Sequence, residues 1–572
     1  MSAHSVEDIK RDSARLRGSL LESLADPVTG ALREADQTLI KYHGSYQQED
    51  RDARKKRDKP GVGKAYMFMV RLKLPGGKLT ADQYLAMDEL TGRYANGTLR
   101  ITTRQGFQFH GVLKDGLKPS IVAIHHALAT TIAACGDVRR NVMGCPVDLD
   151  HPAHRAVREA AERIAAELTP QSRAYYEIWL DGEKVAASGE EEPFYGPQYL
   201  PRKFKAGVAL STDNCIDVYS QDAALLAVVE GGAIRGFNVL VGGGLGMTHG
   251  KGDTIARLAE PLGFVAVEHG AAAIREVAAI FRDHGNRADR RHARLKYLIH
   301  ERGLEWFRGE FTARAGFPLH PAVQLPTPEF HDHLGRFRTS DGSWNYGVFI
   351  QSGRIADSAR QPLRAALRQV VSRYRPGLAL TGQQNLLFTG LTETAAAEIE
   401  RELRAAGVTP APELHPVRRY SMACPALPTC GLAVAESERA LPALLDRLEA
   451  ELVSLGVADR PLTVRMTGCP NGCARPYTAD IAFVGRSLGL YQIYVGGGLA
   501  GDRVADLYQD KVKDADLLAS LRPLLARWAY EGKPGEGLGD FYQRLLPREA
   551  PRRMVTGREA PTVELVQIGG AA

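Results

Sequence analysis

The sequence contains an internal repeat, and no other feature constrains the fold as strongly. Three segments recur in the same order: LRITTRQGFQFHG (99–111) as LALTGQQNLLFTG (378–390), MGCP (143–146) as MACP (422–425), and FNVLVGGGLG (237–246) as YQIYVGGGLA (491–500). The first two pairs share one offset along the chain, and the third pair has a shorter one. Three matches in one order predict that the chain consists of two structurally related halves.

Each repeat begins with the same predicted elements. A strand-like run (YMFMVRLKL, later WNYGVFIQ) precedes a helical pattern, and two short β-rich stretches and a further helix follow. Thr80 and Asp82 suit the N-cap of the first helix of the first unit, and Thr392 and Thr394 suit the later helix of the second unit. This order predicts an α+β unit, a sheet with helices on one face, that occurs twice and pairs about a pseudo-twofold axis.

Length and composition indicate a globular protein of several units. The chain has 572 residues, of which 44% are hydrophobic and 24% charged, and a chain of that length exceeds one core. No apolar run reaches the roughly 20 residues of a membrane span. The N-terminal stretch carries acids from Glu7 onward and does not resemble a signal peptide. We therefore expect a cytoplasmic protein without membrane contact. The net charge of +6 permits an anionic ligand, although a solvated surface accounts for it equally well.

Four of the seven cysteines form two close pairs. Cys424 and Cys430 lie in CPALPTC, and Cys469 and Cys473 lie in CPNGC. In a cytosolic protein this pattern favours metal ligation over disulfides. Structural zinc sites use closer pairs and often include histidine, whereas four thiolates on rigid Gly/Pro loops suit an iron–sulfur cube. The spacing therefore favours a cluster and leaves zinc as the alternative.

The other three cysteines carry weaker signals. Cys135 lies in an apolar run with a helical pattern, and we expect it to pack in the core. Cys215 lies in a turn, STDNC, without an evident partner. Cys145 aligns with Cys424 across the repeat but has no companion in its own half. We therefore interpret Cys145 as the relic of a ligand that only the second half retains.

The cysteine motifs and their upstream companions resemble a known family. CPALPTC and TGCPNGC, together with RITTRQGFQFHG, RRNVMGCP and LPRKFK, are similar to motifs of the assimilatory sulfite reductase haemoproteins, which belong to the sirohaem nitrite and sulfite reductase superfamily. The resemblance extends in order from about residue 60 to about residue 545. In that family the chain is internally duplicated, and one cysteine thiolate couples a 4Fe-4S cluster to sirohaem.

The resemblance implies an α+β fold with two ferredoxin-like half-domains, paired about a pseudo-twofold axis, and two larger α/β cofactor-binding domains. We expect the amphipathic segment 5–25 to dock on the body or on another subunit, and the basic run 51–61 to be an exposed linker. The expected boundaries are 1–60 for an N-terminal helical extension and linker, 61–135 for half-domain 1, 136–329 for a sirohaem and substrate domain, 330–408 for half-domain 2, and 409–572 for a 4Fe-4S and sirohaem domain.

The resemblance also assigns site residues, and electrostatics supports the residue types. Sirohaem carries several carboxylates and sulfite is an oxyanion, so both need fixed cations, which arginine supplies as planar and permanently charged donors. The cluster ligands would be Cys424, Cys430, Cys469 and Cys473, with Cys473 as the bridging ligand. The residues that match the family's anion-binding set are Arg71, Arg140, Lys203 and Lys205. The implied sirohaem contacts are Arg100, Thr102, Arg104, Gln108, His110, Asn141, Gln384, Asn385, Asn471 and Arg475.

Two of these motifs have a second interpretation. On their own, the alternating polar residues of RITTRQGFQFH would also fit a surface β-hairpin, and an isolated Lys-x-Lys pair usually lies on a solvated strand face. The turn VGGGLG (241–246) lacks the G-x-G-x-x-G spacing of a dinucleotide loop. We expect VGGGLG and its second copy to be tight turns packed near the cofactor.

The resemblance implies the catalytic subunit of an assimilatory sulfite reductase, which reduces sulfite to sulfide with six electrons. No flavin or NADPH module is recognisable, so the electrons would come from an external donor, either an NADPH-oxidising flavoprotein or ferredoxin. The nearest alternative is a ferredoxin-nitrite reductase of the same superfamily. Such relatives tend to carry asparagine in place of the second lysine of the K-x-K pair, and Lys205 therefore favours sulfite. An alternative of another class is a non-catalytic iron–sulfur protein that binds nucleic acid through its basic residues, although we do not expect nucleic acid to be the partner.

Overall fold

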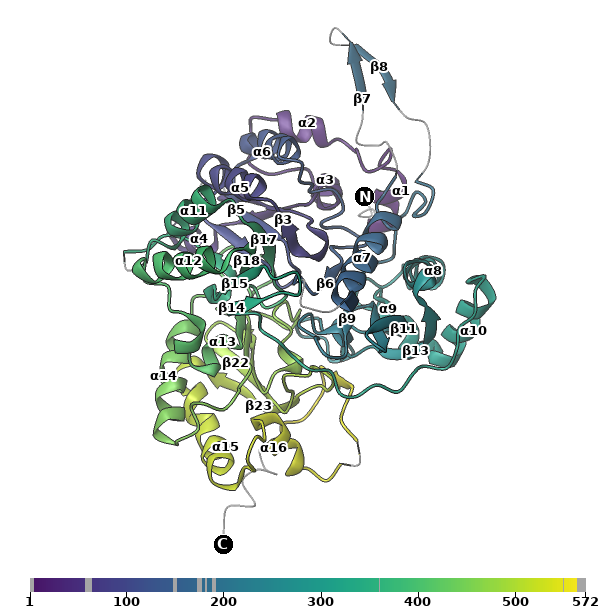
Figure 1. The fold of residues 1–572 in the computed structure, drawn as a ribbon. Helices are drawn as coiled ribbons and strands as arrows, with labels where there is room; N and C mark the ends of the chain where they lie inside the picture. The colour runs from purple at the N-terminus through teal and green to yellow at the C-terminus, as the bar shows by residue number, and fades with distance from the viewer. Residues whose placement is uncertain are drawn as a thin grey trace.

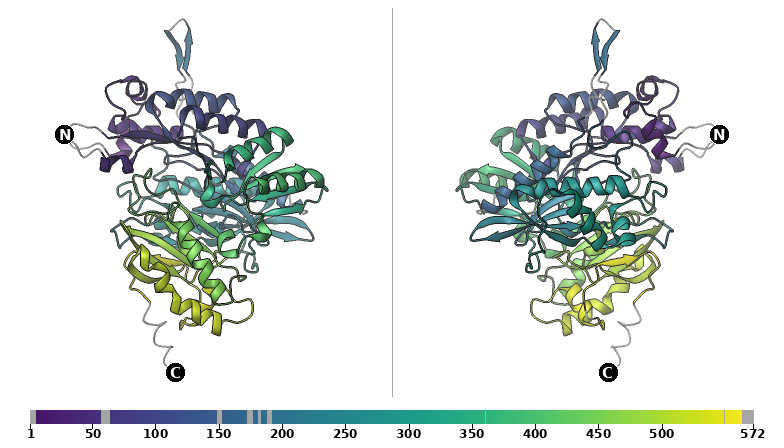
Figure 2. Two further views of the ribbon diagram at one scale, coloured as in Figure 1. Left: turned by 90° about the vertical axis from the view of Figure 1, so that its left-hand side faces the viewer. Right: turned by 90° about the vertical axis from the view of Figure 1, so that its right-hand side faces the viewer.

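The structure is built around four five-stranded sheets, two from each half of the chain (Figure 1). The computed structural model describes residues 5–56, 64–147, 152–171, 177–180, 183–187, 192–359, 361–548 and 550–562. Two short ribbons add to the sheets: β7 (Glu177–Leu180) with β8 (Glu183–Ala187), and β12 (Ile255–Arg257) with β24 (Met554–Thr556). The β7–β8 hairpin projects from the body in both side views (Figure 2).

Two of the sheets belong to the half-domains that the repeat predicts. The first has the strand order β1-β2-β5-β4-β16, and the second has the order β14-β15-β18-β17-β3. The strands are β1 (Ser45–Glu49), β2 (Tyr66–Arg71), β3 (Lys78–Leu79), β4 (Leu99–Ile101), β5 (Phe107–Val112), β14 (Gly335–Arg338), β15 (Trp344–Val348), β16 (Arg354–Ile355), β17 (Gly377–Leu380) and β18 (Leu386–Leu391). Their helices are α5 (Ala81–Tyr94), α6 (Lys114–His126), α11 (Leu363–Tyr374) and α12 (Glu393–Ala405), which lie together in Figure 1.

The strands of the other two sheets contain more residues, and we call these sheets the first and second larger sheets in chain order. They have the same topology as one another. The orders are β6-β9-β10-β11-β13 and β19-β20-β21-β22-β23. In each order the first two strand pairings are parallel and the last two pairings are antiparallel. The strands are β6 (Met143–Gly144), β9 (Ala206–Leu210), β10 (Ala223–Glu230), β11 (Ala233–Val241), β13 (Glu260–Ala266), β19 (Ser421–Ala423), β20 (Val464–Thr467), β21 (Ile481–Ser487), β22 (Leu490–Val495) and β23 (Asp506–Lys513). The helices are α7 (Pro152–Glu167), α8 (Gly270–His284), α9 (Leu295–Arg302), α10 (Leu304–Arg314), α13 (Pro416–Arg419), α14 (Leu441–Ser454), α15 (Leu517–Glu531) and α16 (Leu538–Arg544).

The two half-domains exchange a strand with one another. β3 follows β2 in the chain but pairs with β17 of the second half-domain, and β16 pairs in turn with β4 of the first. The register sets Leu79 opposite Leu378 and Ile355 opposite Leu99. These reciprocal pairs confirm the prediction that the repeated units associate about a pseudo-twofold axis.

Two glutamines at equivalent positions of the repeat reinforce this exchange. Gln105 and Gln384 both occupy the left-handed region, with φ of 52° and 68°, at the tips of their hairpins. The side chain of Gln105 donates a hydrogen bond to the carbonyl oxygen of Leu380 (3.1 Å), and that of Gln384 donates to Ile101 (3.5 Å). Each glutamine also donates to a carbonyl of the next strand in its own half, β6 (2.8 Å) or β19 (3.1 Å). Each hairpin tip therefore joins both halves.

The N-terminal segment packs against the body of the same chain. It forms α1 (Val6–Arg11), α2 (Leu20–Ala25), α3 (Glu34–Leu39) and α4 (Arg51–Lys56), and it also supplies β1, so it is not only helical. Lys10 donates to the carbonyl of Leu200 (3.0 Å), and Glu7 pairs with Arg287 (2.6 Å). Part of the predicted linker 51–61 is the helix α4, and residues 57–61 lie outside the described ranges. No helix in those ranges is long and apolar enough to cross a bilayer.

Apolar burial and helix caps follow the predicted pattern. One apolar core continues from the N-terminal helices through both half-domains into the first larger sheet, and the second larger sheet has a core of its own. Thr80 caps α5 and Thr392 caps α12 with side-chain oxygens that accept hydrogen bonds from backbone N–H groups, whereas Asp82 and Thr394 lie inside these helices.

A buried carboxylate joins the helices of the two half-domains. Asp88 on α5 is 1% exposed, and its two oxygens accept hydrogen bonds from Arg364 (2.6 Å) and Arg368 (2.6 Å), both on α11. Removing one partner of such a pair leaves charge without compensation in a site that water reaches poorly. This contact therefore contributes to the association of the two repeats.

We expect Asp88→Asn to destabilise the half-domain pair by about 2 kcal/mol, since both arginines keep partial contact with water. The measurement is the urea midpoint of the transition in which the half-domains unfold. The control is Glu89→Gln at the neighbouring exposed position of the same helix, which should leave that midpoint unchanged. Equal midpoints for the two variants would contradict a role of Asp88 in joining the repeats.

Candidate active site

The four paired cysteines lie at one edge of the second larger sheet. Cys424 follows β19 and Cys469 follows β20, and these strands are parallel neighbours, so both chain segments leave the sheet at the same end. Cys424 and Cys469 are buried, Cys430 is half-buried, and Cys473 is the exposed member of the four. The fold therefore brings together the two cysteine pairs that the sequence separates.

The surroundings of these thiols fit a metal cluster. Burial, and then the neighbouring thiol of Cys473, raises the pKa of Cys424 to about 12 and that of Cys469 to about 11. A metal that binds these two sulfurs would therefore stabilise their thiolate forms. The backbone N–H of Gly468 points at the sulfur of Cys424 (3.4 Å), and the amide of Asn471 at that of Cys469 (3.5 Å). Such donors stabilise the negative charge of cluster sulfurs.

The spacing of the thiols also disfavours a single ion. The ligand atoms of a tetrahedral zinc site lie within roughly 4 Å of one another. Among the residues that the structure describes, the groups of three or more potential ligands whose donor atoms all lie within 4.8 Å include none of these four cysteines. The wider spacing suits the separate iron corners of a cluster.

Contacts from the first half hold the loop that carries Cys473. The hydroxyl of Thr103 donates to the carbonyl oxygen of Cys473 (2.9 Å), and Arg475 donates to the carbonyl oxygen of Thr103 (2.9 Å). The guanidinium of Arg475 also pairs with Asp217, which Arg465 contacts at 3.0 Å. Arg475, which was expected near the cofactor, thus forms hydrogen bonds and an ion pair that fix the loop.

A row of polar side chains crosses the first half-domain sheet. The register places Arg71 opposite Gln108, Gln108 opposite Arg100, and Arg100 opposite Arg354. With its amide oriented to suit its neighbours, Gln108 accepts a hydrogen bond from Nε of Arg71 (2.9 Å). His110 lies on the same face of β5, and its Nε2 is buried without a hydrogen-bond partner in the described part of the chain. Three of the predicted cofactor contacts are therefore adjacent.

The alternation of polar residues in RITTRQGFQFH predicts that Arg104 lies on the same strand as Arg100, and this prediction is wrong. β4 ends at residue 101, and residues 102–106 form the turn of a hairpin because the chain must reverse into β5. Thr102 stabilises the turn by accepting a hydrogen bond from the N–H of Gly106 (3.3 Å). Arg104 reaches the first larger sheet and donates to Gln221 (2.8 Å), while its Nε is buried without a partner among the described residues. The hairpin is buried and is not a surface feature.

Asn141 and the second hairpin contact the same region from opposite sides. The amide of Asn141 donates to the carbonyl oxygens of Leu74 (2.7 Å) and Arg104 (2.9 Å). Asn385 accepts a hydrogen bond from the backbone N–H of Ile350 (3.0 Å), and its buried Nδ2 has no partner in the described ranges. Gln384 contacts the residue that precedes Cys424. All three amides thus lie at the junction of the two halves.

The predicted anion-binding residues converge from three segments. Arg139 and Phe204 form a parallel β-bridge. Successive side chains in extended backbone point to opposite faces, so the side chains next to this bridge share the other face. These are Arg140, Lys203 and Lys205. Arg71 approaches from the end of β2, and its guanidinium donates to the sulfur of Cys135 (3.1 Å). Contrary to expectation, Cys135 lies beyond the end of α6 in irregular backbone, although it is buried as predicted.

These cations have no carboxylate partners. Within the described residues, none of Arg71, Arg140, Lys203 and Lys205 forms an ion pair with an acidic side chain. Burial, and then repulsion from Arg202 and Arg294, lowers the pKa of Lys203 to about 7. Both lysines keep part of their side chain accessible to solvent. A group of cations that has no acidic partners and remains accessible to solvent is suited to binding an anion.

The sequence-based prediction omitted two further cations. Arg294 pairs with the buried Asp222 (2.6 Å), whose other contact is the backbone N–H of Lys205 (2.9 Å). Lys296 donates to the carbonyl oxygens of Gly244 (3.0 Å) and Gly246 in the turn VGGGLG. A Cβ at Gly244 would lie 2.9 Å from the Arg294 guanidinium, so glycine permits this close approach. The sequence contains one signal for these two cations, the close Arg-x-Lys spacing of Arg294 and Lys296.

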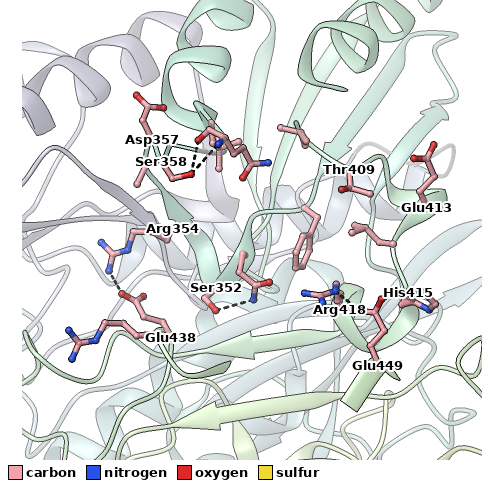
Figure 3. A pocket seen from close by; sticks show the side chains of 18 residues that line it. Ser352, Arg354, Asp357, Ser358, Thr409, Glu413, His415, Arg418, Glu438 and Glu449 are labelled. Atoms are coloured by element: carbon pink, nitrogen blue, oxygen red, sulfur yellow. Dashed lines mark hydrogen bonds and ion pairs between the residues drawn. The ribbon is translucent and has the colours of Figure 1, made fainter. Parts of the chain in front are cut away.

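A cavity of about 670 Å³ is lined by residues from the segments 349–363, 408–418 and 438–449 (Figure 3). Glu438 and Arg354 line it and form an ion pair, and Arg418 and Glu449, which lie next to each other in Figure 3, form another. The backbone N–H of Glu438 donates to the carbonyl oxygen of Cys424 (3.2 Å). None of the four predicted substrate cations lines this cavity, so it is distinct from the group that they form.

Family comparisons agree with this geometry. Residues 159–319 and 416–545 match the model described as the nitrite and sulphite reductase 4Fe-4S domain, and residues 61–125 and 337–406 match the nitrite/sulfite reductase ferredoxin-like half domain. The chain belongs to the nitrite and sulphite reductase family. The paired matches confirm the predicted family, the duplicated fold and the 4Fe-4S domain.

Curated relatives in this family match nearly the whole chain. A sulfite reductase [NADPH] hemoprotein beta-component of Myxococcus xanthus is 48% identical over 539 residues, which cover 94% of this chain and 96% of the relative. The protein of the same name from Chromohalobacter salexigens is 47% identical and covers 95% of each chain. The solved structure of Mycobacterium tuberculosis NirA superposes with a TM-score of 0.77 at 24% identity, covers 94% of this chain and 96% of its own, and shows the shared fold.

We expect Asp217→Asn to loosen the Cys473 loop and to destabilise the protein by about 3 kcal/mol at neutral pH, because Arg465 and Arg475 lose their buried counter-charge. Burial opposes ionisation of Asp217, but the two arginines outweigh it and hold its pKa below the usual value. The stabilisation is therefore complete above the carboxyl pKa of the unfolded chain, about 3.9, and is lost as pH falls through the lower pKa of the folded state.

The measurement is the thermal midpoint of wild type and variant between pH 7 and pH 3. The difference between them should stay constant down to about pH 4 and shrink below it. Asp459→Asn, at an exposed site in the same half, is the control and should show no difference at any pH. A difference that grows on acidification would contradict an ionised Asp217 in the native state.

Proposed function

We propose that the protein is the haemoprotein subunit of an assimilatory sulfite reductase, which reduces sulfite to sulfide with six electrons. The observation that carries the proposal is a group of cations, which includes Lys203 and Lys205 and has no acidic partners in the described ranges, in a member of this family. When bound, sirohaem and the 4Fe-4S cluster supply the redox chemistry, by passing single electrons to the sulfur of the substrate. The chain's own residues bind these groups, hold the anion and deliver protons.

We propose that the four paired cysteines bind the cluster and that Cys473 is the ligand shared with sirohaem. Its exposure, which the other three cysteines lack, supports this role because a shared ligand must contact a second group. The Cys473 loop is held by Thr103 and Arg475, which limits its movement. Three buried nitrogens that have no hydrogen-bond partner among the described residues support a role in binding the macrocycle and its carboxylates: Nε of Arg104, Nε2 of His110 and Nδ2 of Asn385.

We propose that Arg71, Arg140, Lys203 and Lys205 bind sulfite. Cations that lack carboxylate partners attract the oxyanion and withdraw charge from its oxygens. The pKa of Lys203, about 7, lies near neutrality, and a lysine with such a pKa exchanges a proton readily. Lys203 is therefore suited to protonate oxygens that leave the substrate as water. Arginines keep their charge throughout and would hold the anion in place.

We propose that the electrons originate from NADPH and arrive through a flavoprotein partner. The names of the curated relatives include NADPH and a beta-component, which supports a second component. Ferredoxin is the alternative donor. We also propose a cytoplasmic location, since all seven cysteines are free and cluster ligands persist in a reducing compartment.

Nitrite reduction is the competing activity within the family. Lys205 favours sulfite because it adds a cation to this group, at a position where the related nitrite reductases tend to have a neutral asparagine. Sulfite at neutral pH carries more negative charge than nitrite, so an additional cation stabilises it more. The non-catalytic alternative would leave the unpaired cations and the orphaned buried donors of the site unexplained.

The test of this function is a visible spectrum followed by steady-state rates with both anions. We expect Soret and red bands of a tetrapyrrole in the purified protein, and a kcat/KM with an artificial reductant that is larger for sulfite than for nitrite. Protein that contains iron but no tetrapyrrole would refute the proposal. A clear preference for nitrite would assign the chain to the competing activity.

We expect Lys203→Ala to lower kcat for sulfite at least about tenfold, which corresponds to about 1.4 kcal/mol of transition-state stabilisation. The reason is that the variant loses one cation and one proton donor from the group of cations that we propose to bind sulfite. The measurement is kcat with an artificial reductant in protein of equal tetrapyrrole content. Lys251→Ala, at an exposed site of the same half, is the control and should retain the wild-type rate. An unchanged rate for Lys203→Ala would mean that this lysine does not act on the substrate.

A further inference from the structure

A second group of potential metal ligands lies in the core, and it shares no residue with the cysteines of the cluster. Cys145, Asp213, Cys215 and His333 each place one donor atom within 4.8 Å of the donor atoms of the other three. All four residues are buried. In the described part of the chain this is the only group with such an arrangement. The prediction that Cys145 has no companions in its half is therefore wrong.

The separations between the donor atoms resemble those around one tetrahedral ion. Nε2 of His333 lies 3.3 Å from Oδ2 of Asp213 and 3.7 Å from the sulfur of Cys145. With zinc bonds of about 2.3 Å to sulfur and about 2.0 Å to nitrogen or oxygen, neighbouring donors lie roughly 3.3–3.8 Å apart. The sulfur of Cys145 is nearer to Oδ2 of Asp213, at 2.7 Å, and would move outward by about 1 Å on binding.

Buried polar atoms in and beside this group also support a bound ligand. Oδ1 of Asp213 and Nδ1 of the adjacent His154 are buried polar atoms without hydrogen-bond partners among the described residues. Polar atoms buried in this way are costly unless a ligand or water satisfies them.

We propose that Cys145, Asp213, Cys215 and His333 bind one structural zinc ion. Two thiolates, an imidazole and a carboxylate form a mixed set that zinc accepts, and four protein ligands close the site to water and substrate. Nε2 of His154 lies 3.4 Å from Oδ2 of Asp213, where it would orient the ligating carboxylate. This inference concerns other residues than the proposed redox site and does not depend on the proposed function.

The ion would fasten together segments that are distant in the sequence. Cys145 follows β6, Asp213 and Cys215 lie in the loop after β9, and His333 lies in the segment that leads to β14 in the second half. The same loop continues to Asp217, the partner of Arg475. The zinc would therefore anchor the start of the second half and support the loop that carries Cys473.

The test begins with the full-length protein, purified in reducing buffer without chelator. We expect elemental analysis to find about one zinc per chain in addition to iron. X-ray absorption at the zinc edge, which iron does not disturb, should show two sulfur ligands near 2.3 Å and two nitrogen or oxygen ligands near 2.0 Å. This measurement needs no variant, so it stays decisive if the variants fold poorly.

The variants His333→Ala and Cys215→Ser should each lower the zinc content at least tenfold. The matched control is His331→Ala in the same segment, where the side chain is 51% exposed and should not affect zinc. A chelator should lower the thermal midpoint of wild type and control but not that of His333→Ala. Intact wild type without zinc, a zinc shell without sulfur, or a disulfide between Cys145 and Cys215 in mass spectra would overturn the proposal.

Discussion

The rest of the structure depends on reciprocal hydrogen bonds, which each of two hairpins donates to the opposite half of the chain. Gln105 and Gln384 each turn the chain in a left-handed conformation and donate hydrogen bonds to a strand of the opposite half. Since a buried carbonyl without a partner is costly, these bonds fix how the repeats meet. The tip of the first hairpin also carries Thr103 and Arg104, which reach the cysteine loop and the first larger sheet. The site lies at the junction because the hairpins do.

At this junction, neighbouring protein groups do not neutralise the basic side chains or stabilise the buried thiolates. Arg71, Arg140 and the two lysines have no acidic partners in the described ranges, and Cys424 and Cys469 are buried where a thiolate is unstable without metal. Both conditions cost stability in the protein alone and are relieved when ligands of the opposite charge bind. By contrast, Asp217 and Asp222 neutralise the arginines whose task is to hold the surrounding loops.

Much of this arrangement was predictable. The repeat predicted two α+β units paired about a pseudo-twofold axis, Thr80 and Thr392 act as the expected caps, and the resemblance of the motifs led to the correct family. The errors concern residues whose surroundings come from distant parts of the chain. Arg104 lies on a turn, not on a strand, and Cys145 meets Asp213 and His333, which no local pattern connects to it.

The sequence by itself determined the duplication, the two rigid cysteine loops and the presence of closely spaced basic residues, because periodicity, Gly/Pro content and residue type are local properties of the chain. Only the tertiary structure decided which basic residues lack an acidic neighbour, which thiol stays exposed and which buried ligands share one point in space. These properties depend on distances between segments that are tens to hundreds of residues apart in the sequence, and burial and charge act through those distances.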